Sequence, residues 1–239
     1  MAAALGALLL TAAPAHADTD IKDHPAPALA PGVAIATFNS DSTAADACTA
    51  GWLVHTGDGQ AGVLTAGHCF HGGGAAFATS SRTVEGIGRF IEHEHSGSRG
   101  EDSDIALLGI GNFPSAKQLP TDTRIIGIRP VVAPADPGHL SQGQTLCHFG
   151  QASGLQCGPV TRVTGTKVEF AAPADTGDSG GPVYYRDSDG TARPVGIAIR
   201  GDNTGTVAEL IRPWLTRWNL AVDTTTANAA TAVGQQTGR

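Results

Sequence analysis

Short apolar runs, separated by turn residues, cover the chain from Gly32 onward. Such runs predict short strands, and their regular recurrence is typical of an antiparallel barrel or sandwich. The composition agrees, because 32 glycines and 14 prolines indicate many turns and few long helices. The runs are 33–38, 51–55, 62–65, 83–91, 105–110, 124–128, 161–170, 181–185 and 194–199.

One segment near the C-terminus departs from this strand pattern. Pro213 is tolerated at the first position of a helix. Trp214, Leu215 and Trp218 then fall on one helical face. The pattern predicts a short C-terminal helix that packs two tryptophans on the domain.

The N-terminal residues are typical of a secretory signal peptide. A continuous run of small apolar residues, 2–13, is followed by Ala15-His16-Ala17, a cleavage pattern with small residues. The run is too short to span a bilayer, and no other membrane-spanning candidate follows. We therefore predict that residues 1–17 are removed, and that the protein is secreted without a membrane anchor.

The remaining chain divides into three parts. Residues 18–31 are rich in Pro and Ala, which predicts an extended leader or linker outside the core. Residues 32–222 carry the apolar runs and form the folded domain. Residues 223–239 contain little but Thr, Ala, Gln and Gly, which predicts a disordered tail.

Length and charge limit the function classes. The chain has 239 residues, 41% of them hydrophobic, which is enough for one β-rich domain or two small ones. Its formal charge of −7 argues against nucleic acid as a partner, because no basic stripe exists to neutralise phosphates. The charge is interpreted as a contribution to solubility.

Four cysteines follow the predicted cleavage site, and an even number suits an exported protein. They allow three pairings. Two local bridges, Cys48–Cys69 and Cys147–Cys157, are the simplest, and each contributes about 3 kcal/mol in the loop-closure model. A metal site is disfavoured, because neither pair has CxxC spacing.

Three motifs contain the residues of a hydrolytic site. Ser179 lies in Gly-Asp-Ser-Gly-Gly-Pro, His68 in Leu-Thr-Ala-Gly-His-Cys, and Asp104 in Ser-Asp-Ile-Ala-Leu-Leu. A serine hydroxyl needs a base within hydrogen-bond reach, and the base needs an orienting carboxylate. The glycines around Ser179 allow the N–H groups of Gly177 and Ser179 to converge on an oxyanion.

Taken singly, each motif also has a structural explanation. Ser179 could be a turn serine, His68 a structural histidine beside a disulfide, and Asp104 a turn aspartate or strand cap. The occurrence of all three in order favours catalysis. An α/β-hydrolase is excluded, because its histidine follows the serine, whereas the last histidine here is His148.

These motifs, with Cys-Thr-Ala-Gly-Trp at 48–52, resemble the trypsin/chymotrypsin family. The cysteine hairpin at 146–158 is similar to that of the bacterial branch, the streptogrisin and α-lytic type. The resemblance covers about Val33 to Val222. It implies an all-β fold of two six-stranded antiparallel barrels, with His68 and Asp104 on the first and Ser179 on the second. The implied reaction is peptide-bond hydrolysis through an acyl-enzyme, with no cofactor and no metal.

The chain departs from the bacterial pattern at one supporting position. An arginine there pairs with the aspartate before the nucleophile, whereas this chain has His148 at that position and Asp178 before Ser179. We expect a charged His148 to be the counter-ion of Asp178 and to titrate near neutrality. A surface histidine in a hairpin is the alternative.

The expected substrate pocket also departs from the family. The family usually has a serine at the position of Ile199, where its hydroxyl supports the catalytic aspartate. Arg200 could favour acidic substrate side chains, or it could simply be solvated. Pro173 best matches the position of the aspartate in trypsin-like pockets, so specificity for basic residues is unsupported. The pocket residues are Pro173, Ala174, Asp175, Thr176, Ile199, Arg200 and Gly201.

Two function classes remain at this stage. The first is a secreted serine endopeptidase, expected to be a monomer that acts on peptide or protein substrates. The second is a weak or inactive homologue that binds a peptide or protein through the same cleft. Two further polar motifs, His93-Glu94-His95 and the segment 187–190, are interpreted as an exposed strand end and a hairpin turn rather than metal sites.

Overall fold

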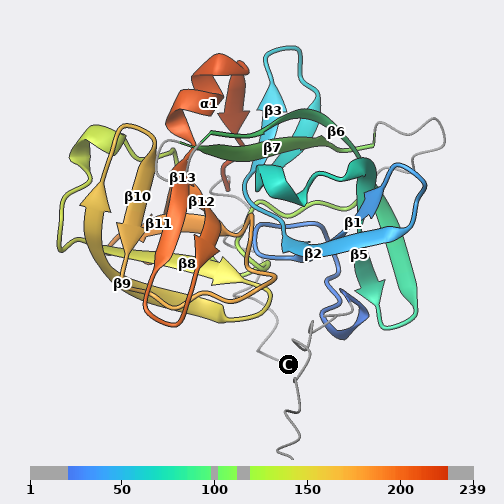
Figure 1. Cartoon of the computed structure of the whole chain (residues 1–239), viewed down its shortest axis with the longest axis horizontal. Helices are drawn as coiled ribbons and strands as arrows, with labels where there is room; N and C mark the ends of the chain where they lie inside the picture. Colours follow the sequence, from blue (N-terminus) through green and yellow to red (C-terminus); the bar gives the residue numbers. More distant parts are fainter. Residues whose placement is uncertain (1–20, 98–101, 112–118, 226–239) are drawn as a thin grey trace, which may run out of the picture.

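The computed structural model describes residues 21–97, 102–111 and 119–225, which form two β-lobes side by side (Figure 1). The all-β fold with a short C-terminal helix is confirmed. The predicted signal peptide, residues 18–20 of the predicted leader and residues 226–239 of the predicted tail lie outside the described residues.

The first lobe is one eight-stranded antiparallel sheet, drawn mainly from blue to green in Figure 1. Its strands are β1 (Ala34–Asn39), β2 (Ala44–Thr49), β3 (Leu53–Thr56), β4 (Ala61–Thr65), β5 (Gly72–Ser80), β6 (Thr83–Ser96), β7 (Ser103–Gly109) and β14 (Leu220–Val222). They are ordered β14-β3-β4-β7-β6-β5-β1-β2. The lobe therefore has more than the six expected strands, because β2 and the C-terminal β14 add to its edges.

The second lobe is a closed six-stranded barrel, as expected, in the order β10-β13-β12-β11-β8-β9. Closure leaves this barrel no unpaired edge. Its strands are β8 (Thr145–Gly150), β9 (Gly154–Val163), β10 (Lys167–Phe170), β11 (Pro182–Arg186), β12 (Ala192–Gly201) and β13 (Thr206–Leu210).

Short helices connect the two lobes or precede them. The predicted C-terminal helix is confirmed as α1 (Arg212–Arg217), although it begins one residue before Pro213 and Trp218 is its C-cap residue. It buries Trp214 and Leu215 and leads into β14 on the first lobe. Trp52, which is fully buried, donates from Nε1 to the carbonyl of Gly196 at 2.8 Å and so joins the lobes. Three single-turn 3₁₀ helices are η1 (Ile21–Asp23), η2 (Gly67–Cys69) and η3 (Pro137–His139).

Two of the predicted strands are wrong. The segment 124–128 is a turn, since Ile126 and Gly127 have left-handed φ values of 45° and 72°. The run 161–170 is two strands, because a turn at 164–166 separates β9 from β10. Apolar content alone did not reveal either chain reversal.

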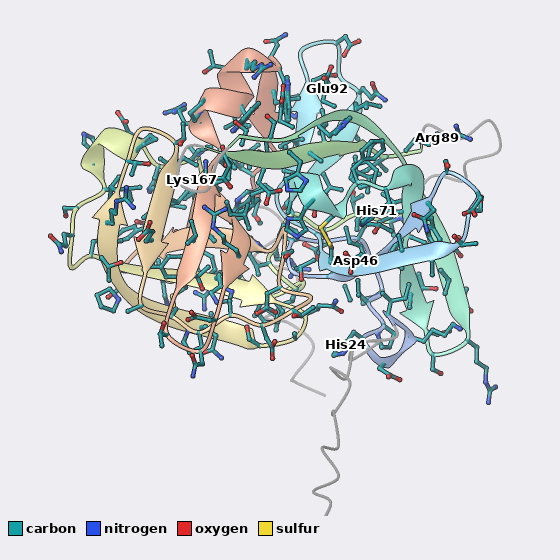
Figure 2. All side chains as sticks on the ribbon, in the orientation of Figure 1. His24, Asp46, His71, Arg89, Glu92 and Lys167 are labelled. Carbon is teal, nitrogen blue, oxygen red and sulfur yellow. A yellow bond between two sulfur atoms is a disulfide. The ribbon has the colours of Figure 1, made fainter. Side chains whose placement is uncertain are left out.

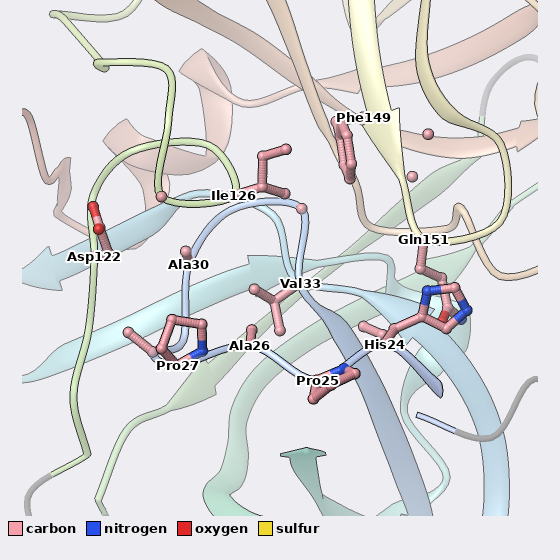
Figure 3. Close-up of a pocket in the computed structure, with 16 residues that line it drawn as sticks. His24, Pro25, Ala26, Pro27, Ala30, Val33, Asp122, Ile126, Phe149 and Gln151 are labelled. Carbon is pink, nitrogen blue, oxygen red and sulfur yellow. The ribbon is translucent and has the colours of Figure 1, made fainter. Parts of the chain in front are cut away.

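The leader is not outside the core, contrary to expectation. Ile21, Leu29 and Ala30 are buried, and the N–H of Leu29 donates to the carbonyl of Pro120 at 2.9 Å. Figure 3 shows the leader along one wall of a hollow of about 300 Å³, with Phe149 of β8 opposite. Residues 21–31 therefore belong to the folded domain.

The start of the predicted tail is ordered as well. Asp223 N–H donates to the carbonyl of Leu53, and Thr225 N–H donates to that of Val131. The prediction of disorder from residue 223 is therefore wrong for 223–225.

Candidate active site

Both predicted disulfides are confirmed, Cys48–Cys69 and Cys147–Cys157. The first joins η2 to β2 and so anchors His68, which lies in the same turn as Cys69. Gly67 must be glycine here, because a Cβ would lie 2.0 Å from the carbonyl oxygen of Glu94. In the described part of the chain, one group of residues has metal-ligand spacing, namely Cys48, His68 and Cys69. Its two sulfur atoms are joined in this disulfide and so are not thiolate ligands.

Asp104 holds His68 through two hydrogen bonds. Its Oδ1 accepts from the backbone N–H of His68 at 2.9 Å, and its Oδ2 lies 2.8 Å from His68 Nδ1. The Asp104 side chain is 6% exposed, whereas that of His68 is 26% exposed. Because the carboxylate oxygen accepts this hydrogen bond, Nδ1 carries the proton, and the lone pair of the ring lies on Nε2.

The pKa of His68 reflects two opposing effects. Burial alone lowers this pKa, but the hydrogen bond and the charge of Asp104 outweigh burial and raise it above 6.5. Arg200 opposes the rise weakly. His68 is therefore a stronger base than a free imidazole.

Ser179 lies in the loop before β11, and this loop packs on the segment that leads to His68. The carbonyl of Ser179 accepts from Thr49 N–H at 2.8 Å. A Cβ on Gly180 would lie 2.0 Å from Thr65 Oγ1 and 3.0 Å from Ala66 N, so the loop and the segment before His68 are in direct contact. No hydrogen bond joins the Ser179 hydroxyl to the His68 ring, although both residues are described; such bonds are often long before substrate binds.

Two N–H groups in this loop have no hydrogen-bond acceptor within the described chain. Within the described chain, neither Gly177 N–H nor Ser179 N–H donates a hydrogen bond. Gly177 has φ +102°, a left-handed conformation that favours glycine. Its carbonyl accepts from Thr49 Oγ1 at 2.8 Å, which fixes the peptide.

The carboxylate of Asp178 organises this loop from inside. It is 1% exposed, and it accepts from Ala152 N–H and Ser153 N–H on Oδ1 and from Asp175 N–H on Oδ2. The two Oδ1 distances are 2.9 and 3.0 Å, and the Oδ2 distance is 2.9 Å. Three peptide groups therefore satisfy a buried charge that was expected to need a side-chain partner.

The expected ion pair of His148 with Asp178 is wrong. His148 is fully buried, and its Nε2 lies 2.7 Å from the carbonyl oxygen of Pro173. Its Nδ1 has no hydrogen-bond partner. Burial lowers the pKa of His148 below 6.5, with Pro173 and Asp178 opposing this effect. His148 is therefore a neutral donor to Pro173 near pH 7, not a counter-ion.

A neutral buried histidine makes stability depend on pH in a definite direction. The unfolded chain binds a proton below about pH 6.5, whereas folded His148 resists it, so acidification favours unfolding. We expect His148→Gln, whose amide can still donate to Pro173, to lose less stability between pH 7.5 and 5 than the wild type loses. Urea unfolding at both pH values measures this difference, and equal losses in the two proteins would contradict it.

The two segments expected to form the substrate pocket do lie together. Ala174 N–H donates to the carbonyl of Asp202 at 2.9 Å, and a Cβ on Gly201 would lie 2.7 Å from that of Ala174. Pro173, Asp175 and Thr176 are exposed beside them, and Ile199 is buried. A hollow of about 360 Å³ adjoins Arg200 and Gly201.

Arg200 does not point freely into this hollow. Its guanidinium forms a bidentate ion pair with Asp102, with N–O distances of 2.5 and 3.2 Å. Asp102 lies two residues before Asp104, so Arg200 links the second barrel to the start of β7, the strand that carries Asp104.

Sequence reasoning missed three buried polar residues near the site. Thr49 contacts the loop that carries Gly177 and Ser179. Lys167 and Glu209 form an ion pair next to the backbone of Asp104. One signal could have found the pair, namely charged residues inside strand-like segments, Lys167 in Lys-Val-Glu-Phe and Glu209 in Val-Ala-Glu-Leu. Charged residues are almost never fully buried unless they are paired.

Known structures share this fold at low sequence identity. A Nocardiopsis protease (NAPase) aligns with a TM-score of 0.58 and 20% identity, covering 82% of this chain and 99% of that one. A structure described as a glutamic acid-specific serine protease aligns with a TM-score of 0.59 and 19% identity, covering 82% and 100%. Both likenesses show the fold alone.

Two relatives found by sequence have a higher identity to this chain than these structures, but the match covers a smaller part of it. Two uncharacterized proteins of Mycobacterium tuberculosis, from strains CDC 1551 and H37Rv, are each 31% identical over 140 residues. The match covers 56% of this chain and spans 60% of the length of those relatives. Residues 35–210 match the Trypsin family, which includes most of both β-lobes and all three motifs. The chain therefore belongs to the trypsin family.

Proposed function

We propose that this protein is an exported serine endopeptidase. The observation that carries the proposal is the pair of hydrogen bonds between Asp104 and His68, which leaves Nε2 as the base beside the loop that contains Ser179. Two free N–H groups in that loop supply what a tetrahedral intermediate needs.

The proposed reaction has two halves. Ser179 Oγ attacks the substrate carbonyl while His68 Nε2 takes its proton, and the oxyanion accepts from the N–H groups of Gly177 and Ser179. His68 then protonates the leaving amine, and an acyl-enzyme remains. Water deprotonated by His68 attacks this ester and frees Ser179. Asp104 stays ionised and stabilises the imidazolium.

Two features support export, and the family supports a peptide or protein substrate. Both disulfides need an oxidising compartment, and the chain opens with a signal-like apolar run. In the described part of the chain, no helix is long and apolar enough to cross a membrane. A family of peptidases implies an extended substrate in the cleft between the lobes. The proposed enzyme acts as a monomer without cofactor.

A binding homologue is the second candidate. Two observations favour it: Ser179 lacks a hydrogen bond to His68, and Ile199 offers the Asp104 carboxylate no donor. Such a protein would bind a peptide in the same cleft without cleaving it.

Covalent labelling separates the two candidates. A fluorophosphonate reacts with a serine only when a base and an oxyanion site activate it. We expect one equivalent of probe on folded, oxidised protein, mapped by mass spectrometry to the peptide that contains Ser179. Urea-unfolded protein is the control and should remain unlabelled. Absence of label on folded protein from about pH 5 to 9 would favour the binding homologue.

A further inference from the structure

A buried ion pair of the second barrel contacts the start of β7, the strand that carries Asp104. Lys167 of β10 and Glu209 of β13 are 2.7 Å apart, with side chains that are 2% and 0% exposed. Figure 2 labels Lys167 on the second barrel. Both residues come from the lobe that carries Ser179, not from the lobe that carries Asp104.

The pair forms hydrogen bonds across the lobe boundary to the backbone at the start of β7. Glu209 Oε2 accepts from Asp104 N–H at 3.3 Å. Lys167 Nζ donates to the carbonyl of Asp102, on the other side of Ser103. The second barrel therefore holds the chain at two points that flank a single residue.

The remaining polar atoms of the pair are also satisfied. Glu209 Oε1 accepts from Trp214 Nε1 of α1 at 2.8 Å. Lys167 Nζ donates to Thr166 Oγ1 at 3.3 Å. With every oxygen bonded, the position of the carboxylate is determined by β10, α1 and β7 together. Burial raises the pKa of Glu209, and its donors Lys167 and Trp214 oppose this rise.

Stability alone does not account for such a pair. Removing two charges from water costs several kcal/mol per ion, and apolar replacements of the same volume are often neutral or stabilising. A pair in the core that contacts the catalytic strand can serve geometry instead.

Asp104 needs geometric support at this point. Both hydrogen bonds described for its carboxylate come from His68, and Ile199 offers none. The direction of the carboxylate must therefore be determined by the backbone of Asp104. That backbone is bound by Glu209.

We propose that Glu209, held in place by Lys167, is a positioning residue that fixes the backbone of Asp104 and thereby the orientation of His68. The proposal rests on the proposed protease function. It makes the contact between the lobes part of the catalytic site, because the second barrel orients a residue of the first.

The test removes the pair as a unit, because a single change would leave a buried charge unpaired. Lys167→Met/Glu209→Met replaces both side chains by unbranched apolar ones of similar size and supplies no acceptor to Asp104. We expect kcat for a peptide substrate to fall about 10- to 100-fold with KM unchanged, since small misplacements of catalytic groups have effects of this size. A merely structural pair would change the denaturation midpoint and leave kcat unchanged.

Two further comparisons keep the result unambiguous. Lys167→Arg/Glu209→Asp retains the ion pair but withdraws the carboxylate from Asp104, and we expect it to show a similar loss of kcat even if the methionine variant does not fold. The control is Arg193→Met/Asp187→Asn, which removes an ion pair of 2.7 Å in the same barrel, away from Asp104. The control should retain the wild-type kcat.

A spectroscopic readout separates this proposal from the proposed function. The proton NMR resonance of His68 Nδ1–H reports its hydrogen bond to Asp104, whether or not Ser179 is reactive. We expect it to shift or broaden in both pair variants and to be unchanged in the control. A wild type that takes no fluorophosphonate label would refute the protease function, and the resonance would still decide the positioning role. Unchanged kcat or an unchanged resonance in a folded pair variant would overturn the proposal.

Discussion

Ser179→Ala is expected to lower kcat for peptide hydrolysis about a million-fold, which is the scale seen when a triad nucleophile is removed. The side chain of Ser179 makes no hydrogen bond within the described chain, and its backbone contact with Thr49 does not depend on the hydroxyl. We therefore expect the free energy of unfolding to change by no more than about 0.5 kcal/mol.

The measurement compares single-turnover cleavage of a peptide with urea unfolding of the same samples. Ser188→Ala is the matched control, because Ser188 is an exposed serine in the turn between β11 and β12. It should retain wild-type turnover. Equal turnover by Ser179→Ala and the wild type would show that hydrolysis, if any, uses another group.

The second large effect is expected from Asp104→Asn. Asparagine keeps the shape but removes the charge, so His68 loses both its tautomer preference and the stabilisation of its imidazolium. We expect kcat to fall about 10,000-fold, as it does when a triad aspartate becomes asparagine.

The pH dependence of kcat/KM provides an independent readout. Only neutral His68 acts as base, so wild-type kcat/KM should rise with pH through the raised pKa of His68, above 6.5. Without Asp104 the effect of burial remains and lowers that pKa. The rise should therefore move to lower pH in the variant.

A second histidine–aspartate pair offers a control for this prediction. His55 Nδ1 lies 2.6 Å from Asp223 Oδ1 at an exposed site on the first lobe. Asp223→Asn should leave both kcat and the pH profile unchanged, because exposed pairs contribute little. An unchanged pH profile in Asp104→Asn would contradict the role assigned to Asp104.

Local motifs could be predicted because their chemistry is contained in a few adjacent residues. The C-terminal helix needed only a proline in its first turn and one apolar face. The disulfides followed from sequence proximity, since each closes a short loop. The turn at 187–190 joins two strands, as its Asp-Ser-Asp-Gly composition indicated.

The failures concern residues whose partners are distant in sequence. The leader was placed outside the core because it is rich in proline, but Leu29 is buried through its contact with residues near Pro120. His148 was paired with Asp178 by analogy, whereas the backbone of the 152–153 turn already occupies that carboxylate. Backbone donors have no signature in the sequence.

The sequence by itself determined the trypsin family, the β-rich architecture and the identity of His68, Asp104 and Ser179 as candidates, because each lies in a short motif whose spacing reports its chemistry. Only the tertiary structure decided what surrounds them. It brought Glu209 to the backbone of Asp104 and Lys167 to that of Asp102, although they are distant along the chain, and it turned Arg200 toward Asp102. The physical reason is that a buried charge needs a partner close to it in the folded core. Strand pairing brings together residues that no local sequence pattern connects.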